Sequence, residues 1–151
     1  MSARINLGTY DAATLLHKPT TAATTISGAG TVAVAAKILD LGDAVSRMDA
    51  KAIVEVAAAT VATGDQVTIN IQLSDSATFA DDIYNVGVLE LGDNASLVGD
   101  TDVGAGRYEI PFNNVISGTV KRYCRTYATI TAKSPNSPAT SVSYIAYLVP
   151  A

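Results

Sequence analysis

The sequence predicts an all-β protein built as an antiparallel sandwich of two sheets, and three observations lead to this prediction. Residues 67–73 alternate strictly between apolar and polar side chains, which is the pattern of a strand with one buried face. About seven to nine short stretches of this kind follow one another toward the C-terminus. Clusters of Gly, Asn, Asp, Ser and Pro separate them, and these are the residue types that turns prefer.

The central stretch has a neighbour in residues 51–60, which also alternate, with Val54 on one face and Glu55 on the other. The link between the two, residues 62–65, contains the Gly and Asp that tight turns prefer. A strand such as 67–73 needs flanking strands for its backbone and a second layer for its apolar face. We therefore predict a β-hairpin of residues 51–60 and 67–73 at the centre of the fold, with 67–73 as an interior strand.

Residues 1–30 have no steady period, so we predict an extended N-terminal arm ahead of a sandwich domain at residues 31–151. Residues 11–16 allow one helical turn, and residues 20–30 are a tract of small Thr, Ala and Gly residues that suits a spacer. The arm docks either on its own sandwich, as an added edge strand, or on a neighbouring molecule. The candidate partner-binding residues are its larger apolar side chains, namely Ile5, Leu7, Tyr10, Leu15 and Leu16.

The pattern is least regular between residues 31 and 51. Residues 31–36 alternate as a strand, and residues 38–43 lead into a turn. Residues 44–51 keep helical spacing for a turn or two before β-branched residues favour a strand again. The secondary structure of residues 44–51 therefore remains ambiguous.

Four further strands are predicted after the central hairpin, at residues 84–91, 107–112, 123–131 and 141–149. Pro111 lies in the second of these and marks it as an edge strand or as the end of a strand, because proline cannot donate to the ladder. Residues 117–118 form a turn. The longest loops are expected at residues 94–106 and 133–138.

Charge is sparse in this chain, with 48% apolar residues, 16% charged residues and a formal net charge of −4. A surface built from Thr, Ser, Asn, Gly and Ala suits a protein that packs against other molecules. The only basic cluster, Lys121, Arg122 and Arg125, is divided between two faces of a strand, so we expect no nucleic-acid partner. No apolar run is long enough to cross a bilayer and no signal peptide is recognised, so we expect no membrane partner and assembly in a cytoplasm.

No group of residues indicates catalysis or a bound metal. His17 is the only histidine, and nothing near it in the sequence completes a catalytic triad or a metal site. Asp100 and Asp102 lie in a Gly-rich stretch that lacks the remaining ligands of a calcium loop. The single Cys124 cannot form an intramolecular disulfide and is predicted to be a small core residue. We expect no enzymatic activity, no metal and no cofactor.

Several stretches, taken in order, are similar to a known family: residues 38–42 (ILDLG), 69–79 (INIQLSDSATF), 106–114 (GRYEIPFNN), 123–127 (YCRTY) and 143–148 (SYIAYL). From about residue 30 to the C-terminus, this order resembles the small jelly-roll capsid cement (decoration) proteins of tailed bacteriophages. The resemblance implies a two-sheet jelly roll on the outside of an icosahedral head. There it bridges neighbouring major capsid subunits, often as a symmetric oligomer. The arm at residues 1–30 matches this pattern least.

The resemblance leads us to expect a structural virion protein whose partners are the major capsid protein and further copies of itself, in a dimer or trimer. We expect it on the capsid exterior, after assembly in the host cell cytoplasm. Two other classes fit an all-β chain of this composition. One is a tail or neck structural protein. The other is a sugar-binding (receptor-binding) β-sandwich module, which would need an aromatic platform of Tyr rings because the chain has no Trp.

Overall fold

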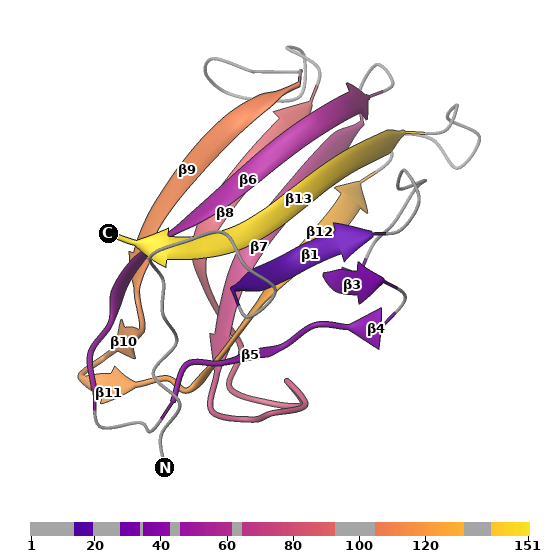
Figure 1. Cartoon of the computed structure of the whole chain (residues 1–151). Coiled ribbons are helices and arrows are strands. Elements are labelled where there is room, and N and C mark those ends of the chain that lie inside the picture. Colours follow the sequence, from indigo (N-terminus) through magenta and orange to yellow (C-terminus); the bar gives the residue numbers. More distant parts are fainter. Residues whose placement is uncertain are drawn as a thin grey trace.

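The computed structural model describes residues 14–19, 28–33, 35–42, 46–61, 65–92, 105–131 and 140–151. This part of the chain consists of strands and their connections and contains no helix. Two larger sheets lie one behind the other, with the long strands of both running in similar directions (Figure 1). The predicted all-β class with two packed antiparallel sheets is therefore confirmed.

The first sheet has six strands in the order β4-β3-β1-β13-β6-β9. Its neighbours are antiparallel except for β1 and β3, which are parallel. Pro111 lies in β9, at one edge of this sheet, as its missing N–H group predicts. The strands are β1 (Leu15–Pro19), β3 (Thr31–Ala33), β4 (Ala35–Ala36), β6 (Asp49–Thr60), β9 (Gly106–Asn113) and β13 (Ser141–Pro150).

The second sheet follows the order β2-β12-β7-β8, and β5 also pairs with β12. The strand predicted at residues 67–73 is β7, and it lies between β12 and β8, so its prediction as an interior strand is confirmed. The strands are β2 (Gly28–Ala29), β5 (Leu39–Asp40), β7 (Gln66–Ser74), β8 (Tyr84–Gly92) and β12 (Tyr123–Thr131).

A small two-stranded ribbon of β10 (Val115–Ile116) and β11 (Thr119–Val120) completes the structure at one end of the sandwich. Its turn residues, Ser117 and Gly118, have φ angles of 50° and 79°. Positive φ at both central positions is the pattern of a type I′ turn, whose twist matches that of the flanking strands. The predicted turn is confirmed here.

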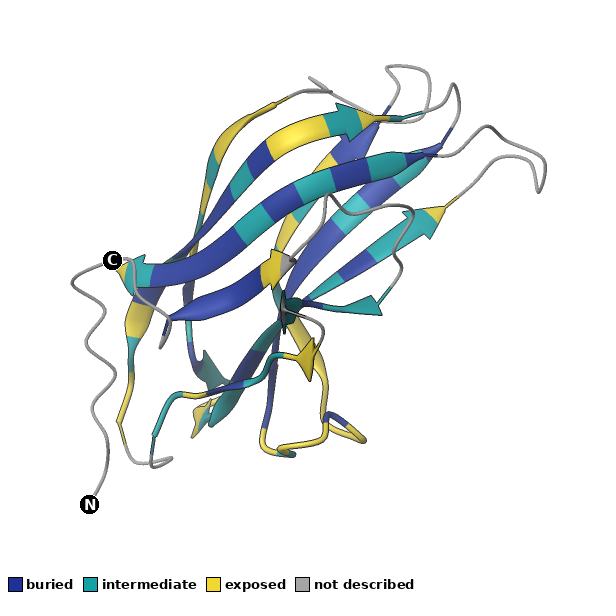
Figure 2. Ribbon diagram, turned by 45° about the vertical axis from the view of Figure 1, so that its right-hand side comes forward, coloured by how far each residue is buried: buried dark blue, intermediate teal, exposed yellow. Residues whose placement is uncertain are grey.

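The core lies between the two sheets and consists of the inward-facing residues of the long strands. Buried and less buried positions alternate along β13 and its neighbours (Figure 2). Ile69, Ile71 and Leu73 of β7 are fully buried, and Val54 of β6 and Leu148 of β13 face them from the other sheet within one cluster. Full burial of such side chains stabilises the fold by about 1.5–3 kcal/mol each.

The predicted hairpin of residues 51–60 and 67–73 is wrong, because β6 and β7 belong to different sheets. β6 pairs with β13 and β9, and β7 pairs with β12 and β8. Alternation shows that a strand has one buried face. It does not show whether two such strands pair within one sheet or face each other from two sheets, because the pattern is the same in both cases. The chain crosses from the first sheet to the second after Thr60. Asp65, immediately before β7, is buried and accepts a hydrogen bond of 2.6 Å from the Thr140 hydroxyl.

The N-terminal strands belong to the sandwich, and the first described strand begins at Leu15, ahead of residue 31. Leu15 and Leu16 are extended and are not part of a helical turn, because β1 pairs with β13 and with β3. The alternative of a short helix near residue 50 is also wrong, since β6 begins at Asp49 and residues 46–48 are irregular. The loops predicted at residues 94–106 and 133–138 lie almost wholly outside the described residues.

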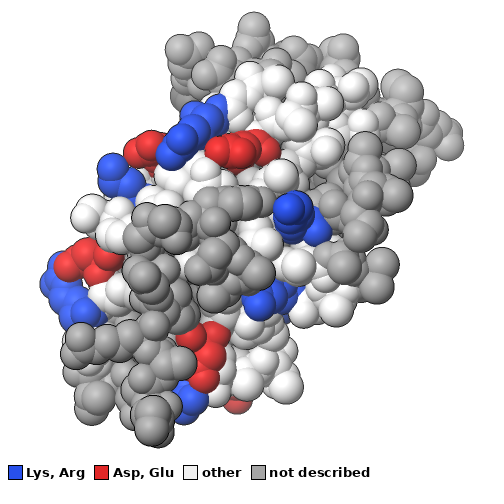
Figure 3. All heavy atoms as spheres, in the orientation of Figure 1, with Lys and Arg blue, Asp and Glu red and all other residues white. Residues whose placement is uncertain are grey.

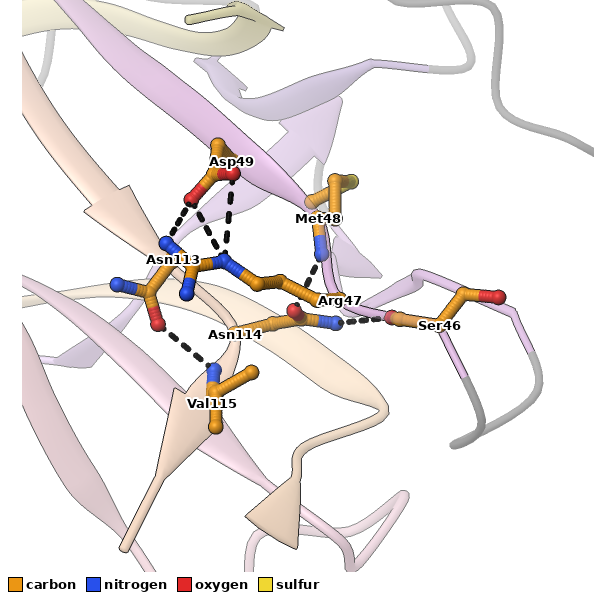
Figure 4. Close-up of polar contacts among 7 residues, drawn as sticks. All are labelled: Ser46, Arg47, Met48, Asp49, Asn113, Asn114 and Val115. Atoms are coloured by element: carbon orange, nitrogen blue, oxygen red, sulfur yellow. Dashed lines mark hydrogen bonds and ion pairs between the residues drawn. The ribbon is translucent and has the colours of Figure 1, made fainter. Parts of the chain in front are cut away.

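Asn114 joins three segments at the end of the sandwich that carries β10 and β11 (Figure 4). Its side-chain oxygen accepts a hydrogen bond of 2.7 Å from the Met48 N–H group, and its amide nitrogen donates to the carbonyls of Ser46 and Lys121 at 3.3 Å each. Asn114 is only 2% exposed, so water cannot easily replace these partners.

We predict that Asn114→Ala lowers the free energy of unfolding by about 2–3 kcal/mol, because it leaves the Met48 N–H group and the Lys121 carbonyl without this partner. Asn113→Ala is the matched control. Its side chain accepts one half-buried hydrogen bond from the Val115 N–H group, so a loss of about 1 kcal/mol or less is expected. Urea unfolding at neutral pH measures both, and equal losses would contradict the role assigned to Asn114.

Candidate interaction surfaces

The two described residues of the predicted arm surface, Leu15 and Leu16, pack within their own chain. Leu16 is fully buried in the main core. Leu15 lies on the outer face of the six-stranded sheet and contacts Ile53 and Tyr147. For these two residues the structure corresponds to the alternative in which the segment adds a strand to its own sandwich. Ile5, Leu7 and Tyr10 lie outside the described residues.

An apolar cluster therefore forms on the outer face of the six-stranded sheet. Leu15, Ile53 and Tyr147 are between 0% and 6% exposed, and the Tyr147 hydroxyl donates a hydrogen bond of 2.7 Å to Glu55. The Thr14 carbonyl accepts a hydrogen bond of 3.0 Å from the Leu148 N–H group. The chain thus enters β1 immediately beside this cluster.

Among the described residues seen on this side in Figure 3, charged side chains are few and scattered, and most of the acidic groups lie beside a basic one. Lys51 and Glu109, on the neighbouring strands β6 and β9, form an exposed ion pair of 3.3 Å. Arg107 lies 3.7 Å from the same carboxylate. Exposed pairs of this kind contribute about 0–1 kcal/mol each, so they shape the surface more than they stabilise the fold.

The opposite outer face, on the β12-β7-β8 sheet, carries a connected row of polar side chains. The register places Arg125 beside Gln72 and Gln72 beside Asn85 on three adjacent strands. The Arg125 Nε atom donates to Gln72 Oε1 at 2.9 Å, and Gln72 Nε2 donates to Asn85 Oδ1 at 2.9 Å. We call this surface, with the neighbouring Phe79 and Tyr127, the Arg125 face.

Two aromatic rings hold the Arg125 guanidinium in place. Its central carbon lies 4.2 Å from the ring centroid of Phe79 and 5.0 Å from that of Tyr127. Phe79 belongs to the connection between β7 and β8, is buried and has a φ of 54°, which is rare for a bulky residue. Burial lowers the pKa of Arg125 from its ordinary value. These contacts restrain the Arg125 side chain within its own chain.

The predicted division of the basic cluster is also visible in its contacts. Arg122 makes two hydrogen bonds, of 2.9 and 2.7 Å, to the Asp40 carboxylate. Lys121 is buried and forms an ion pair of 2.7 Å with Asp75. Arg125, in contrast, bonds to Gln72. The three cations point to three separate partners and do not form one basic patch.

His17 has a role that the sequence pattern did not predict, as a buried residue on the inner side of β1. A bulge separates the pairs Leu15–Tyr147 and His17–Ala146, and it turns the imidazole inward. The Nδ1 atom accepts a hydrogen bond of 2.9 Å from the Thr31 N–H group, and the ring stacks on Tyr144 with centroids 4.1 Å apart. Only the bulge and the parallel pairing with β3 create this position, and neither has a signal in the sequence.

The second imidazole nitrogen, Nε2, faces a small cavity and has no partner among the described residues. The cavity, about 20 Å³ in volume, is lined mostly by apolar side chains of β12 and β13. A space of this size admits about one water molecule, so it is no site for a larger ligand. Burial lowers the pKa of His17 to about 4.

The described residues contain no group of three His, Cys, Asp or Glu side chains that could hold a metal ion. Cys124 is fully buried, and burial raises the pKa of its thiol to about 12. Asp100 and Asp102 lie outside the described residues. No helix in the described part of the chain is long and apolar enough to cross a membrane. In comparisons with known proteins, no family model and no curated protein matches this chain.

We predict that His17 makes the protein less stable as the pH falls from about 7 to 4. The folded state holds this imidazole neutral, with a pKa of about 4, against an ordinary value of 6.5. The unfolded state therefore binds more protons between these values, which lowers the free energy of unfolding by up to about 3 kcal/mol at pH 4. Below the folded-state pKa this contribution changes no further.

His17→Gln is the matched variant, because its side-chain oxygen can still accept from the Thr31 N–H group but does not titrate. Urea unfolding of both proteins between pH 7 and pH 4 isolates the histidine, since the carboxylates are common to both. The difference in free energy of unfolding between the wild type and His17→Gln should shift against the wild type as the pH falls. Parallel pH profiles for the two proteins would show that the imidazole is not held neutral.

Proposed function

We propose that this protein is a structural virion protein, a capsid decoration (cement) protein that binds the outer surface of a phage head and bridges major capsid subunits. The observation that supports the proposal is that the Arg125 face is built from two of the stretches that carry the family resemblance. Gln72 and Phe79 come from the stretch at residues 69–79, and Arg125 and Tyr127 come from that at residues 123–127. Both stretches are among those that resemble phage cement proteins, and they meet on the outer face of one sheet, where Arg125 and Tyr127 are partly exposed and Gln72 and Phe79 are buried.

A decoration protein stabilises the shell because its binding is thermodynamically coupled to shell assembly. A molecule that binds the assembled shell and not its separate subunits stabilises the shell by the free energy of its own binding. Each contact needs only modest affinity, because many copies act on one closed lattice. A broad sheet face supplies the roughly 800 Å² per partner that a specific interface uses, without requiring a pocket.

The character of the Arg125 face suits this role. It offers a guanidinium, amide groups and aromatic rings on neighbouring strands, and these are residue types that interfaces use for hydrogen bonding and stacking. The formal net charge of −4 suits a protein on the shell exterior that does not contact the genome.

In this proposal the partners are the major capsid protein and further copies of the chain, as a dimer or trimer, and the chain needs neither enzymatic activity nor a cofactor. The protein resides on the outside of the virion after assembly in the host cell cytoplasm. Ile5, Leu7 and Tyr10 add contacts to the shell or to a neighbouring copy. Leu15 and Leu16 instead hold β1 in its own sandwich.

We predict that Arg125→Ala weakens binding to heads that lack this protein at least about tenfold, or 1.4 kcal/mol. Lys51→Ala is the matched control, because it removes one positive charge from the opposite outer face and should leave binding unchanged. Co-sedimentation of each folded variant with purified heads measures the affinity. Equal weakening by both substitutions, or no binding by the wild type, would contradict the proposal.

A second prediction concerns the arm. Replacing Ile5, Leu7 and Tyr10 together by Ser should weaken head binding at least about tenfold, while the melting temperature changes by less than roughly 2 °C. The reason is that a partner, and not the chain's own core, buries these side chains in the proposed complex. A large drop in melting temperature with unchanged head binding would instead assign them to the fold. Scanning calorimetry and the same co-sedimentation assay give the two readings.

A sugar-binding module is the second candidate function, and one observation favours it. The exposed amide side chain of Asn85 shares the Arg125 face with the partly exposed Tyr127 ring, and an amide group beside an aromatic ring suits a sugar hydroxyl and a pyranose face. Binding of the intact protein to a glycan array, abolished by Tyr127→Ala, would favour this function over shell binding.

A further inference from the structure

Arg125 differs from the other arginines in the described part of the chain, because no carboxylate there pairs with it. Among these residues, the arginines that lie within 3.7 Å of an Asp or Glu oxygen are Arg47, Arg107 and Arg122. The Arg125 guanidinium instead bonds to the neutral side chain of Gln72, at 2.9 Å. Its positive charge therefore has no counterion within the described structure, although the whole chain has a formal net charge of −4.

Most of the hydrogen-bonding capacity of this guanidinium is unused. Its Nε–H group bonds to Gln72, but the N–H groups of Nη1 and Nη2 have no acceptor among the described residues. These two nitrogens form an edge with which an arginine can bind a carboxylate through two parallel hydrogen bonds. Arg125 is partly exposed, so a group on another molecule can reach it.

The hydrogen bonds beside Arg125 also leave donors, and not acceptors, toward the edge of the sheet. Gln72 accepts from Arg125 with its oxygen and donates from its nitrogen to Asn85 Oδ1 at 2.9 Å. The N–H groups of Asn85, an exposed residue, then remain for an outside acceptor. Both ends of this row therefore offer N–H groups, which complement a partner surface rich in oxygen acceptors.

The site holds a single positive charge. Lys121 and Arg122, which come shortly before Arg125 in the chain, form ion pairs of 2.7 Å with Asp75 and Asp40. A phosphate monoester carries nearly two negative charges at neutral pH and is usually bound by several cationic groups. A carboxylate carries one negative charge, and its planar shape matches the guanidinium. Arg125 therefore fits a carboxylate better than a phosphate.

The surroundings of the guanidinium strengthen such an ion pair. Its central carbon lies 4.2 Å from the ring centroid of Phe79, which is buried, and 5.0 Å from that of Tyr127. These rings occupy space beside the cation that water would otherwise fill, and charges are screened less where water is excluded. A carboxylate that reaches Arg125 is thus bound more firmly than one that meets a fully solvated arginine.

We propose that the Arg125 guanidinium binds the carboxylate of one Asp or Glu side chain on the surface of the major capsid protein, through parallel hydrogen bonds from Nη1 and Nη2. The inference deepens the proposed function and rests on it for the identity of the molecule that carries the carboxylate. Because this chain is itself acidic, long-range attraction to an acidic surface is weak. The ion pair instead fixes the register of the docked protein and slows its release.

The first test uses the full-length protein labelled with ¹⁵N, without phage heads. It follows the arginine Nε–Hε NMR signals during addition of sodium acetate, with sodium chloride at equal ionic strength as the reference. The Arg125 signal should shift at least about threefold further with acetate than with chloride. The Arg122 signal is the internal control. Its guanidinium is already bonded to Asp40 through two hydrogen bonds, so it should respond equally to both salts.

The second test measures binding to heads that lack this protein. Arg125→Lys keeps the positive charge but cannot supply two parallel bonds, so it should weaken binding at least about fivefold. Arg107→Lys is the matched control, because it makes the same change on the opposite outer face and should alter binding by less than about twofold. Circular dichroism and melting temperature establish that both variants fold.

Three results overturn the inference. They are an Arg125 signal that does not distinguish acetate from chloride, full head binding by Arg125→Lys, and saturation of the site by inorganic phosphate at a concentration at least about tenfold below that of acetate. Failure of the proposed function has a different signature, namely a wild-type protein whose Arg125 signal responds to acetate as expected but which does not bind heads.

Discussion

The two sheets of this protein are stable only as a pair, because each buries its apolar face against the other. Among the described residues, the inner side chains of β7 pack in one cluster with those of the opposite sheet, and Ile71 is as fully buried as Val54 across the sandwich. This constraint makes the chain leave the plane after β6 and return in the second sheet. It also fixes the backbone register that aligns the outward-facing side chains, so the arrangement of the Arg125 face is a consequence of the core.

The inner and outer faces of the two sheets differ in the side chains that they carry. Inward-facing residues of the long strands form the core, and His17 extends that core to the N-terminal strand through its stacking on Tyr144. The outward-facing residues of the two sheets form different surfaces. One side carries the apolar cluster beside the start of β1, and the other carries the Arg125 face.

The long strands β7 and β13 could be predicted from the sequence because strict alternation at residues 67–73 and 141–149 reflects one buried face, whereas β1 and the two-residue strands β2, β10 and β11 were not predicted. The partner of each strand could not, because alternation is the same for strands that pair and strands that face each other, and the predicted hairpin failed for this reason. The position of His17 depends on a bulge, and the contact of Arg125 with Gln72 depends on register. Both are properties of pairing between segments distant in the sequence, so local patterns do not contain them.

The central claim is that this chain decorates the outside of a phage head. Cryo-electron microscopy of purified virions, at a resolution that traces the backbone, tests it most directly. If the chain is a decoration protein, the map contains sandwich-shaped density on the outer shell surface in many symmetry-related copies, with the Arg125 face against the major capsid protein. Density for the chain in the tail or neck, or a shell whose outer surface carries no such sandwich, would contradict it.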